Sequence, residues 1–141
     1  MGFFSYLLKK RLLNANPDDI PNFSFNGYNT YARVVRVYDG DTITILFQYH
    51  KRIYKYSCRI YGIDTPEIRT RNEEEKIKGY EARDFLSSYI LEQIIKVHFL
   101  DFDKYGRPLV NLYIKINGDY IDIAKLMISQ GYAKPYFGGT K

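Results

Sequence analysis

Two turn signals and one change of hydrophobic period do most to constrain the fold of this chain. Asp39-Gly40 and Asn117-Gly118 are dipeptides typical of tight turns between antiparallel strands. Between them, residues 72–90 leave the two-residue period of a strand for helical spacing, with apolar side chains three and four positions apart. The pattern therefore predicts antiparallel strands on both sides of a central helix.

The apolar alternation elsewhere predicts five main strands and a short sixth, over residues 31–38, 42–49, 52–63, 94–102, 109–116 and 119–121. Asp122 is placed to cap a short helix that ends at Gly131. Five strands with a helix between the third and the fourth form the pattern of an OB-fold barrel. We therefore predict an α+β domain over residues 31–141. It would be a five-stranded OB-fold β-barrel with a helix between strands 3 and 4 and a short C-terminal helix.

Residues 1–30 precede this pattern and are expected to form an N-terminal amphipathic helical arm and linker. A helix over residues 3–13 would place four apolar side chains on one stripe beside three basic ones. The stripe consists of Phe4, Leu7, Leu8 and Leu12, and the basic residues are Lys9, Lys10 and Arg11. Residues 14–29 contain two prolines and a glycine, as expected of a connector. Two alternatives remain open for the arm: a mobile or membrane-surface tether, and a helix docked on the barrel.

Charge and cysteine content narrow the class of protein. The net charge of +5 and the pI of about 9.2 favour an acidic partner, with nucleic acid before an anionic membrane. Cys58 is the only cysteine, which excludes an intrachain disulfide, and its strand position predicts a buried, inert thiol. The sequence has neither a secretory signal nor the roughly 20 apolar residues of a spanning helix. We therefore expect an intracellular or virion-associated protein, with its oligomeric state open.

Acidic residues gather where the predicted strands begin and end. Asp41 opens the second strand, Asp64 follows the third, and Glu67 comes three residues later. Acids that converge repel one another unless a cation or an arginine lies between them. Oxygen ligands without histidine or cysteine indicate Ca²⁺ or Mg²⁺ rather than zinc, and the backbone carbonyl of Thr65 is a further candidate ligand. Each acid alone is more often a turn residue or a solvated charge.

Two arginines are candidates for binding phosphate. Arg59 stands between Cys58 and Ile60, an apolar setting in which a charge is costly unless it is paired with an acid or a phosphate. A guanidinium can form two parallel hydrogen bonds to phosphate oxygens, which lysine cannot do. With Arg107 and the acids in the same pocket, the domain would be equipped to hydrolyse phosphodiester bonds.

Together these residues resemble the staphylococcal nuclease (thermonuclease) family, over roughly residues 32–136. The motifs that carry the resemblance are Asp39-Gly40-Asp41-Thr42, Arg59, Asp64-Thr65-Pro66-Glu67, Asp103-Lys104-Tyr105-Gly106-Arg107, Gly79-Tyr80-Glu81-Ala82 and Gly131-Tyr132-Ala133-Lys134. The resemblance implies an OB-fold endonuclease that depends on Ca²⁺. It would cleave DNA and RNA with little sequence specificity and leave 3′-phosphate ends.

The resemblance also implies a role for each matching residue. The roles are metal ligands (Asp41, Asp64 and the Thr65 carbonyl), catalytic residues (Arg59, Glu67 and Arg107), substrate-binding residues (Lys104, Tyr105 and, one position out of step, Tyr136) and a carboxylate behind the metal ligands (Asp39). Glu67 would act as the general base or position the attacking water.

Two other functions remain open. A non-catalytic OB-fold module would hold single-stranded nucleic acid with basic and aromatic side chains. Three carboxylates beside a phosphate groove argue against it, because they would repel the ligand of a passive binder. A membrane-surface or scaffold protein would use residues 3–13, but that function does not explain the acids. We therefore expect Ca²⁺ as cofactor and DNA or RNA, preferably single-stranded, as partner.

Overall fold

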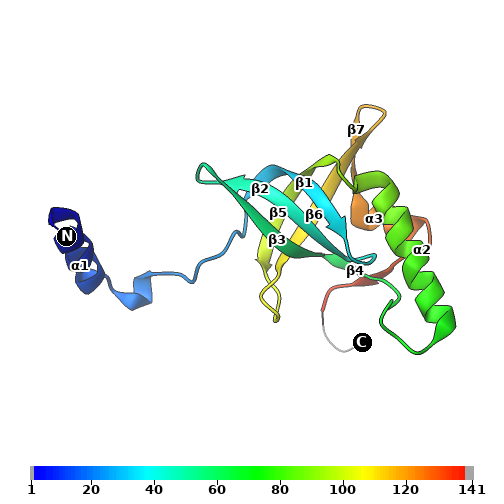
Figure 1. Cartoon of the computed structure of the whole chain (residues 1–141), viewed down its shortest axis with the longest axis horizontal. Helices are drawn as coiled ribbons and strands as arrows, with labels where there is room; N and C mark the ends of the chain where they lie inside the picture. Colours follow the sequence, from blue (N-terminus) through cyan, green and yellow to red (C-terminus); the bar gives the residue numbers. More distant parts are fainter. Residues whose placement is uncertain (1, 139–141) are drawn as a thin grey trace.

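Five long strands form the barrel in the computed structural model, which describes residues 2–138 (Figure 1). They are β1 (Asn29–Val37), β2 (Thr42–Tyr49), β3 (Arg52–Ile60), β5 (Ile94–Phe102) and β6 (Pro108–Ile116). Neighbours in the order β3-β2-β1-β5-β6 pair antiparallel, and a parallel pairing of β3 with β6 closes the barrel. This topology confirms the α+β OB-fold barrel.

Short elements complete the fold: β4 (Gly62–Asp64), β7 (Asp119–Asp122), β8 (Lys134–Tyr136), α1 (Phe3–Asn14), α2 (Glu73–Ile90), α3 (Ile123–Ser129) and a 3-10 turn at Pro17–Asp19. The prediction of one continuous strand over residues 52–63 is wrong in one respect, because the structure divides this segment into β3 and β4. The backbone leaves β3 after Ile60, and Gly62 has a φ of 91°, which L-residues rarely adopt. β4 thereby turns away from the barrel and pairs with β8, a strand that the sequence pattern did not indicate.

The two predicted turns contain glycine for different physical reasons. Asn117 and Gly118 have φ values of 51° and 88° and join β6 to β7 in the predicted two-residue turn. Gly40 instead lies in a four-residue connection, residues 38–41, and is not in the left-handed region. A Cβ on Gly40 would lie 2.7 Å from the side chain of Thr65. Glycine at this position therefore admits the close approach of Thr65.

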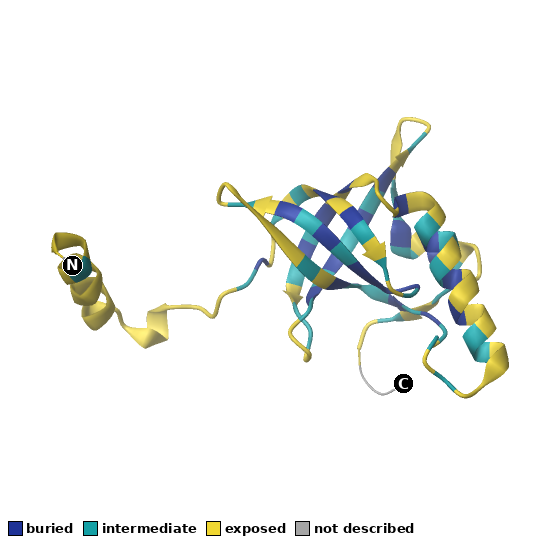
Figure 2. Cartoon of the chain, in the orientation of Figure 1, coloured by how far each residue is buried: buried dark blue, intermediate teal, exposed yellow. Residues whose placement is uncertain are grey.

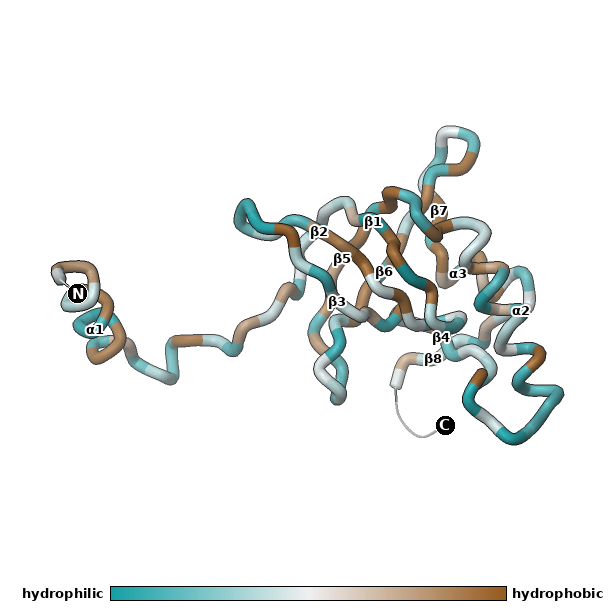
Figure 3. The backbone as a smooth tube through the Cα atoms, in the orientation of Figure 1, coloured by the Kyte–Doolittle hydropathy of each residue, from teal (hydrophilic) through white to brown (hydrophobic). Residues whose placement is uncertain are grey.

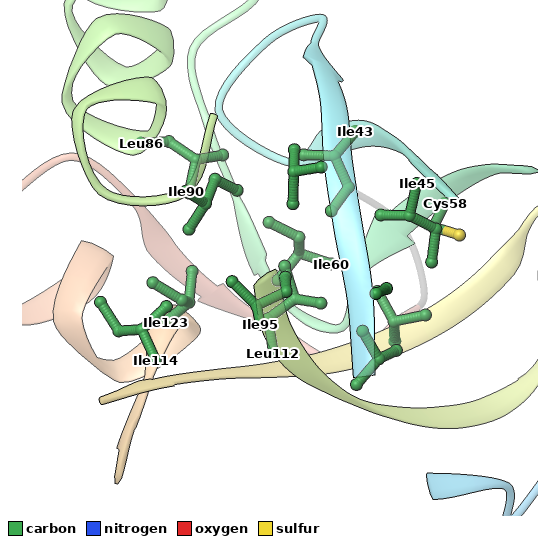
Figure 4. Close-up of a cluster of buried hydrophobic side chains, with 14 of the residues drawn as sticks. Ile43, Ile45, Cys58, Ile60, Leu86, Ile90, Ile95, Leu112, Ile114 and Ile123 are labelled. Carbon is green, nitrogen blue, oxygen red and sulfur yellow. The ribbon is translucent and has the colours of Figure 1, made fainter. Parts of the chain in front are cut away.

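The core lies inside the barrel and under α2. Buried and exposed residues alternate along the strands, so that each strand turns one face inward (Figure 2). Figure 4 shows the centre of this cluster, with Leu86 and Ile90 of α2 on one side, Ile45 and Cys58 on the other, and Ile43 and Ile60 between them. Cys58 is buried, as expected, and its burial raises the pKa of the thiol to about 12.

Helix α2 begins and ends where its sequence predicts. The Asn72 side chain accepts a hydrogen bond from the Glu75 N–H at 3.0 Å, and three glutamates occupy the first turn. One helical face buries Ala82, Leu86 and Ile90 against the barrel. The short helix α3 is likewise capped by the Asp122 side chain, which accepts the Lys125 N–H.

Helix α1 lies apart from the barrel, with apolar and charged residues intermixed along it (Figure 3). None of its residues is buried, and Phe4 is 87% exposed. The docked alternative is therefore not the arrangement in this structure. Within the described residues, no helix combines the length and the apolar character needed to cross a membrane.

The connector that follows α1 contributes to the core, which its composition did not indicate. Phe25 is 3% exposed and fits among the aromatic rings at one end of the barrel. Its ring centre lies 5.3 Å from that of Phe47 and 5.3 Å from that of Phe99. The division at residue 30 stays a prediction, but a shortened chain must retain Phe25 to keep this packing.

Candidate active site

A pocket beside β4 gathers most of the predicted site residues. Figure 1 shows β4, the β5–β6 connection and the C-terminal segment on the same side of the barrel. The predicted residues that line the pocket are Asp39, Asp41, Arg59, Glu67, Lys104, Tyr105, Arg107 and Tyr136. Asp64 and Thr65 line an adjoining hollow, beside the N-terminal turn of α2. Residues from five separate stretches of the chain therefore meet at this site.

Arg59 lies at the centre of the site. Its side chain is 13% exposed, and Nη1 is 3.1 Å from Asp41 Oδ2. Nη2 is 3.9 Å from Asp64 Oδ1 and donates a hydrogen bond to the Ile63 carbonyl at 3.1 Å. Despite its closeness to Asp41, Nη1 has no well-aligned hydrogen-bond partner within residues 2–138. A buried guanidinium with spare donor capacity is suited to an anion such as phosphate.

Asp39 and Asp41 are crowded together at the end of the β1–β2 connection. Oδ1 of Asp39 accepts the Asp41 N–H at 3.0 Å, and Oδ1 of Asp41 accepts the Thr42 hydroxyl at 3.2 Å. Burial, followed by the negative charge of Asp41, raises the pKa of Asp39 to about 7. The two carboxyl groups therefore compete for ionisation at this end of the connection.

The carboxylates around Arg59 are compatible with a divalent cation. Asp41 from the β1–β2 connection and Asp64 from β4 present oxygen atoms, the ligands that Ca²⁺ and Mg²⁺ prefer. Across the described chain, no three histidine, cysteine or acidic side chains converge into a closed metal cage. The residues therefore fit an open site, in which the remaining ligands would be backbone carbonyls, water or a substrate phosphate.

Arg107 is positioned by a loop that Asp103 organises. Oδ1 of Asp103 accepts the N–H groups of Tyr105 and Arg107, both at 2.9 Å, while its Oδ2 is 2.9 Å from Arg107 Nε. Gly106 has a φ of 78° and completes the turn. Sequence reasoning assigned no role to Asp103. Its signal was an aspartate followed by a glycine three positions later, a pattern typical of turns in which the side chain binds the backbone.

Arg107 also points toward the acids. Its Nη1 is 3.4 Å from the hydroxyl of Thr42, the residue next to Asp41. The guanidinium lies 5.6 Å from the Tyr105 ring, and the Lys104 ammonium lies 5.2 Å from the same ring. Tyr105 itself is 72% exposed, so its ring is available to a ligand.

Tyr136 reaches the pocket through β8. The pairing of β8 with β4 sets Tyr136 opposite Gly62, and the Arg59 guanidinium lies 5.7 Å from its ring centre. The structure thus places Tyr136 beside the proposed phosphate site, although the residue is one position out of step in sequence. This placement depends on a strand pairing between residues more than 70 positions apart.

Glu67 is held at the rim of the pocket by α2. The segment that precedes it packs so closely against Gly79 that a Cβ there would lie 2.9 Å from the Pro66 carbonyl. A side-chain oxygen of Glu75 is 3.5 Å from the Glu67 N–H. The first turn of α2 therefore contacts the loop that carries Glu67.

Comparison with known proteins agrees with this geometry. The staphylococcal nuclease homologue family matches residues 57–141. The thermonuclease of Staphylococcus hyicus is 31% identical over 72% of this chain and 54% of its own length. An uncharacterized protein of Methanocaldococcus jannaschii is 27% identical over 87% of this chain and 71% of that protein. A probable endonuclease lcl3 of Talaromyces marneffei is 23% identical over 98% of this chain and 50% of that protein.

The chain thus spans about half the length of the thermonuclease and of the fungal endonuclease. The family match extends from β3 to the C-terminus and includes most of the predicted site, from Arg59 to Tyr136. Fold, site geometry and sequence similarity agree, and the chain belongs to the staphylococcal nuclease family.

Proposed function

We propose that the domain is a Ca²⁺-dependent endonuclease that hydrolyses DNA or RNA with little sequence specificity and leaves 3′-phosphate ends. The observation that carries the proposal is the buried Arg59, which lies near both Asp41 and Asp64 and whose Nη1 has no well-aligned hydrogen-bond partner in the described part of the chain. Glu67 and Arg107 line the same pocket. A site of this kind offers groups for a cation, a phosphate and a water in one place.

Each residue has a role in this proposal. Asp41 and Asp64, with the Thr65 carbonyl, would hold Ca²⁺, which when bound polarises a non-bridging phosphate oxygen. Arg59 and Arg107 bind the phosphate and oppose the negative charge that develops on its oxygens. Glu67 accepts a proton from the attacking water, or positions that water. The water oxygen bonds to phosphorus, the bond from phosphorus to the 5′ oxygen breaks, and that oxygen takes up a proton.

Lys104, Tyr105 and Tyr136 would bind the nucleotide next to the scissile phosphate. Lys104 supplies charge, and the exposed ring of Tyr105 offers a face on which a base can stack. Asp39 would help to position Asp41, because its side chain accepts a hydrogen bond from the Asp41 N–H. The pocket is open on one side of the barrel, which favours flexible, unpaired strands over a rigid duplex.

One assay separates this proposal from a passive binding module. The purified protein is incubated with single-stranded DNA and RNA, with Ca²⁺ or with excess chelator, and the fragments and their ends are analysed. We expect fragments with 3′ phosphates only when Ca²⁺ is present. Cutting that continues in chelator would overturn the metal assignment. Tight binding without fragments, at any Ca²⁺ concentration, would establish the binding module instead.

A contact between residues 3–13 and an anionic membrane is a second proposal. Phe3, Phe4, Leu8, Leu12 and Leu13 are all more than half exposed on α1, beside three basic residues. The test compares co-sedimentation with vesicles of phosphatidylserine and phosphatidylcholine for the full chain and a chain lacking residues 2–16. Binding to the anionic vesicles that disappears with α1 supports the contact. Equal binding by both proteins rejects it, and an intracellular or virion-associated location stays a prediction.

A further inference from the structure

Another hollow, distinct from the one lined by Asp64 and Thr65, lies between β1, the loop over residues 68–70 and α2. We call it the basic groove, and its polar lining consists of Arg36, Tyr38, Arg69, Thr70, Lys76, Tyr80 and Arg83. Four of these residues are cationic. No acidic side chain of the described chain lines it. The active-site pocket differs, because its arginines face Asp41 and Asp103.

The positive charge of the basic groove is largely unpaired. Within residues 2–138, Arg36, Arg69 and Lys76 form no ion pair, and only Arg83 meets a carboxylate, that of Asp84 at 3.0 Å. Like charges around one hollow repel one another unless an anion lies between them. The groove is therefore suited to an anionic ligand.

Two tyrosine rings hold the guanidinium groups in place. Arg36 lies 5.3 Å and Arg69 lies 6.0 Å from the ring centre of Tyr38, and Arg83 lies 4.6 Å from that of Tyr80. Arginines held over rings lose less freedom when they bind, which favours binding. Guanidinium groups also match phosphate oxygens in two-point geometry.

The spacing of the cations favours a chain of phosphates over a single anion. Lys76 and Arg83 are seven residues apart on α2, which corresponds to about 10 Å along the helix axis. Arg36 and Arg69 come from a strand and a loop on the other side of the groove. This span along α2 is longer than one inorganic phosphate, and successive phosphates of a nucleic-acid strand match it better.

The basic groove also borders the active-site pocket. Tyr38 directly precedes Asp39, and Ile68-Arg69 directly follow Glu67, so the same two backbone segments border both hollows. We propose that the groove binds the sugar–phosphate backbone of the substrate strand beyond the scissile phosphate. The proposal rests on the nuclease function proposed above, because it makes the groove an extension of that site.

The test measures binding in chelator, so that it is independent of cleavage. Fluorescence anisotropy of a labelled 20-nucleotide single strand is recorded against salt for wild type and for Arg36→Ala/Arg69→Ala. Loss of two phosphate contacts should raise Kd at least about 10-fold and reduce the slope of log Kd against log salt by about 1.4. The effect on a dinucleotide should be smaller, because a dinucleotide is too short to occupy both hollows.

Two control variants make the result specific. Arg36→Lys/Arg69→Lys keeps both charges and should retain most of the salt slope. Arg52→Ala/Lys55→Ala removes two exposed cations from the half of β3 that lies farther from Arg59. This variant should leave the Kd and the salt slope close to those of wild type. Equal values for wild type and Arg36→Ala/Arg69→Ala would overturn the groove. So would a change confined to the binding of inorganic phosphate, which would indicate a small-anion site.

Cleavage with Ca²⁺ then separates the two proposals. A higher KM for the 20-nucleotide strand in Arg36→Ala/Arg69→Ala than in wild type supports both. If wild type and Arg36→Ala/Arg69→Ala cut the strand with equal KM values and bind it with equal Kd values, the groove proposal is wrong and the nuclease proposal is not affected. If wild type produces no fragments but the Kd and slope differences persist, the nuclease proposal fails and the groove stands as a strand-binding surface.

Discussion

At the scale of single residues, Arg59 shows how one buried side chain can link two carboxylates of a pocket. Nη1 faces Asp41, and Nη2 reaches both Asp64 and the Ile63 carbonyl. A lysine in its place would provide one point charge in place of this fork. The geometry of the guanidinium is therefore expected to matter as much as its charge.

We expect Arg59→Lys, Arg107→Lys and Glu67→Gln each to reduce the rate of the proposed Ca²⁺-dependent cleavage by at least about 10², since each removes a group that we propose to act on the reacting phosphate or water. The measurement is kcat on a single-stranded substrate. Circular dichroism should show that each variant still folds. If both arginine variants keep nearly full activity, the phosphate site lies elsewhere.

Cys58 provides a test of core burial through pH. Burial raises the pKa of the thiol from 9.0 to about 12, so the folded protein keeps the proton where the unfolded chain loses it. This contribution to stability is complete below pH 9 and is lost as pH rises from about 9 toward 12. The free energy of unfolding should therefore fall more steeply in wild type than in Cys58→Ala, by up to about 1.4 kcal/mol per pH unit. Parallel curves, measured with urea, would mean that the thiol is accessible to water.

At the scale of elements, α2 both covers the barrel and positions the loop of Glu67. Gly79 is the contact point, since a Cβ there would lie 2.9 Å from the Pro66 carbonyl and 3.0 Å from that of Glu67. Within a helix, alanine is usually favoured over glycine by about 1 kcal/mol. At this position the tertiary contact opposes that preference.

We expect Gly79→Ala to destabilise the protein by at least about 1 kcal/mol and to lower kcat, because the loop must move to admit the methyl group. Ser88→Ala, at an exposed position on the same helix, serves as the control and should change neither quantity appreciably. Thermal unfolding and cleavage assays on both variants check this. A Gly79→Ala variant that is stabilised, as helix propensity alone predicts, would show that helix and loop are not in close contact.

At the scale of the whole molecule, the chain consists of a barrel that includes part of the connector and a helix that lies apart from it. Phe25 is among the core aromatics, whereas α1 buries nothing.

We expect Phe25→Ala to lower the free energy of unfolding by about 3–5 kcal/mol. Deletion of residues 2–16 should leave the melting temperature almost unchanged. If the deletion destabilises the protein as much as Phe25→Ala does, α1 docks on the barrel in solution.

Much of this molecule follows from local sequence. Asn72 and Asp122 cap their helices, Asn117-Gly118 forms its turn, and the strand alternation places Cys58 inward, because each depends on a few neighbouring residues. The motifs around Asp41, Asp64 and Arg107 likewise select residues that the structure gathers at one pocket and the hollow beside it.

Other features depended on tertiary structure. The turn between β2 and β3 uses His50 and Lys51 with φ values of 48° and 68°, although it lacks the glycine that usually indicates such a turn in a sequence. The burial of Phe25, the pairing of β8 with β4 and the assembly of the basic groove all require contacts between residues far apart in sequence. Periodicity and turn propensity describe only near neighbours. The antiparallel pairing of β2 with β3 sets Asp41 beside Arg59. Closure of the barrel then brings the segment of Arg107 to Arg59, because it pairs β3 with β6, a strand distant in sequence.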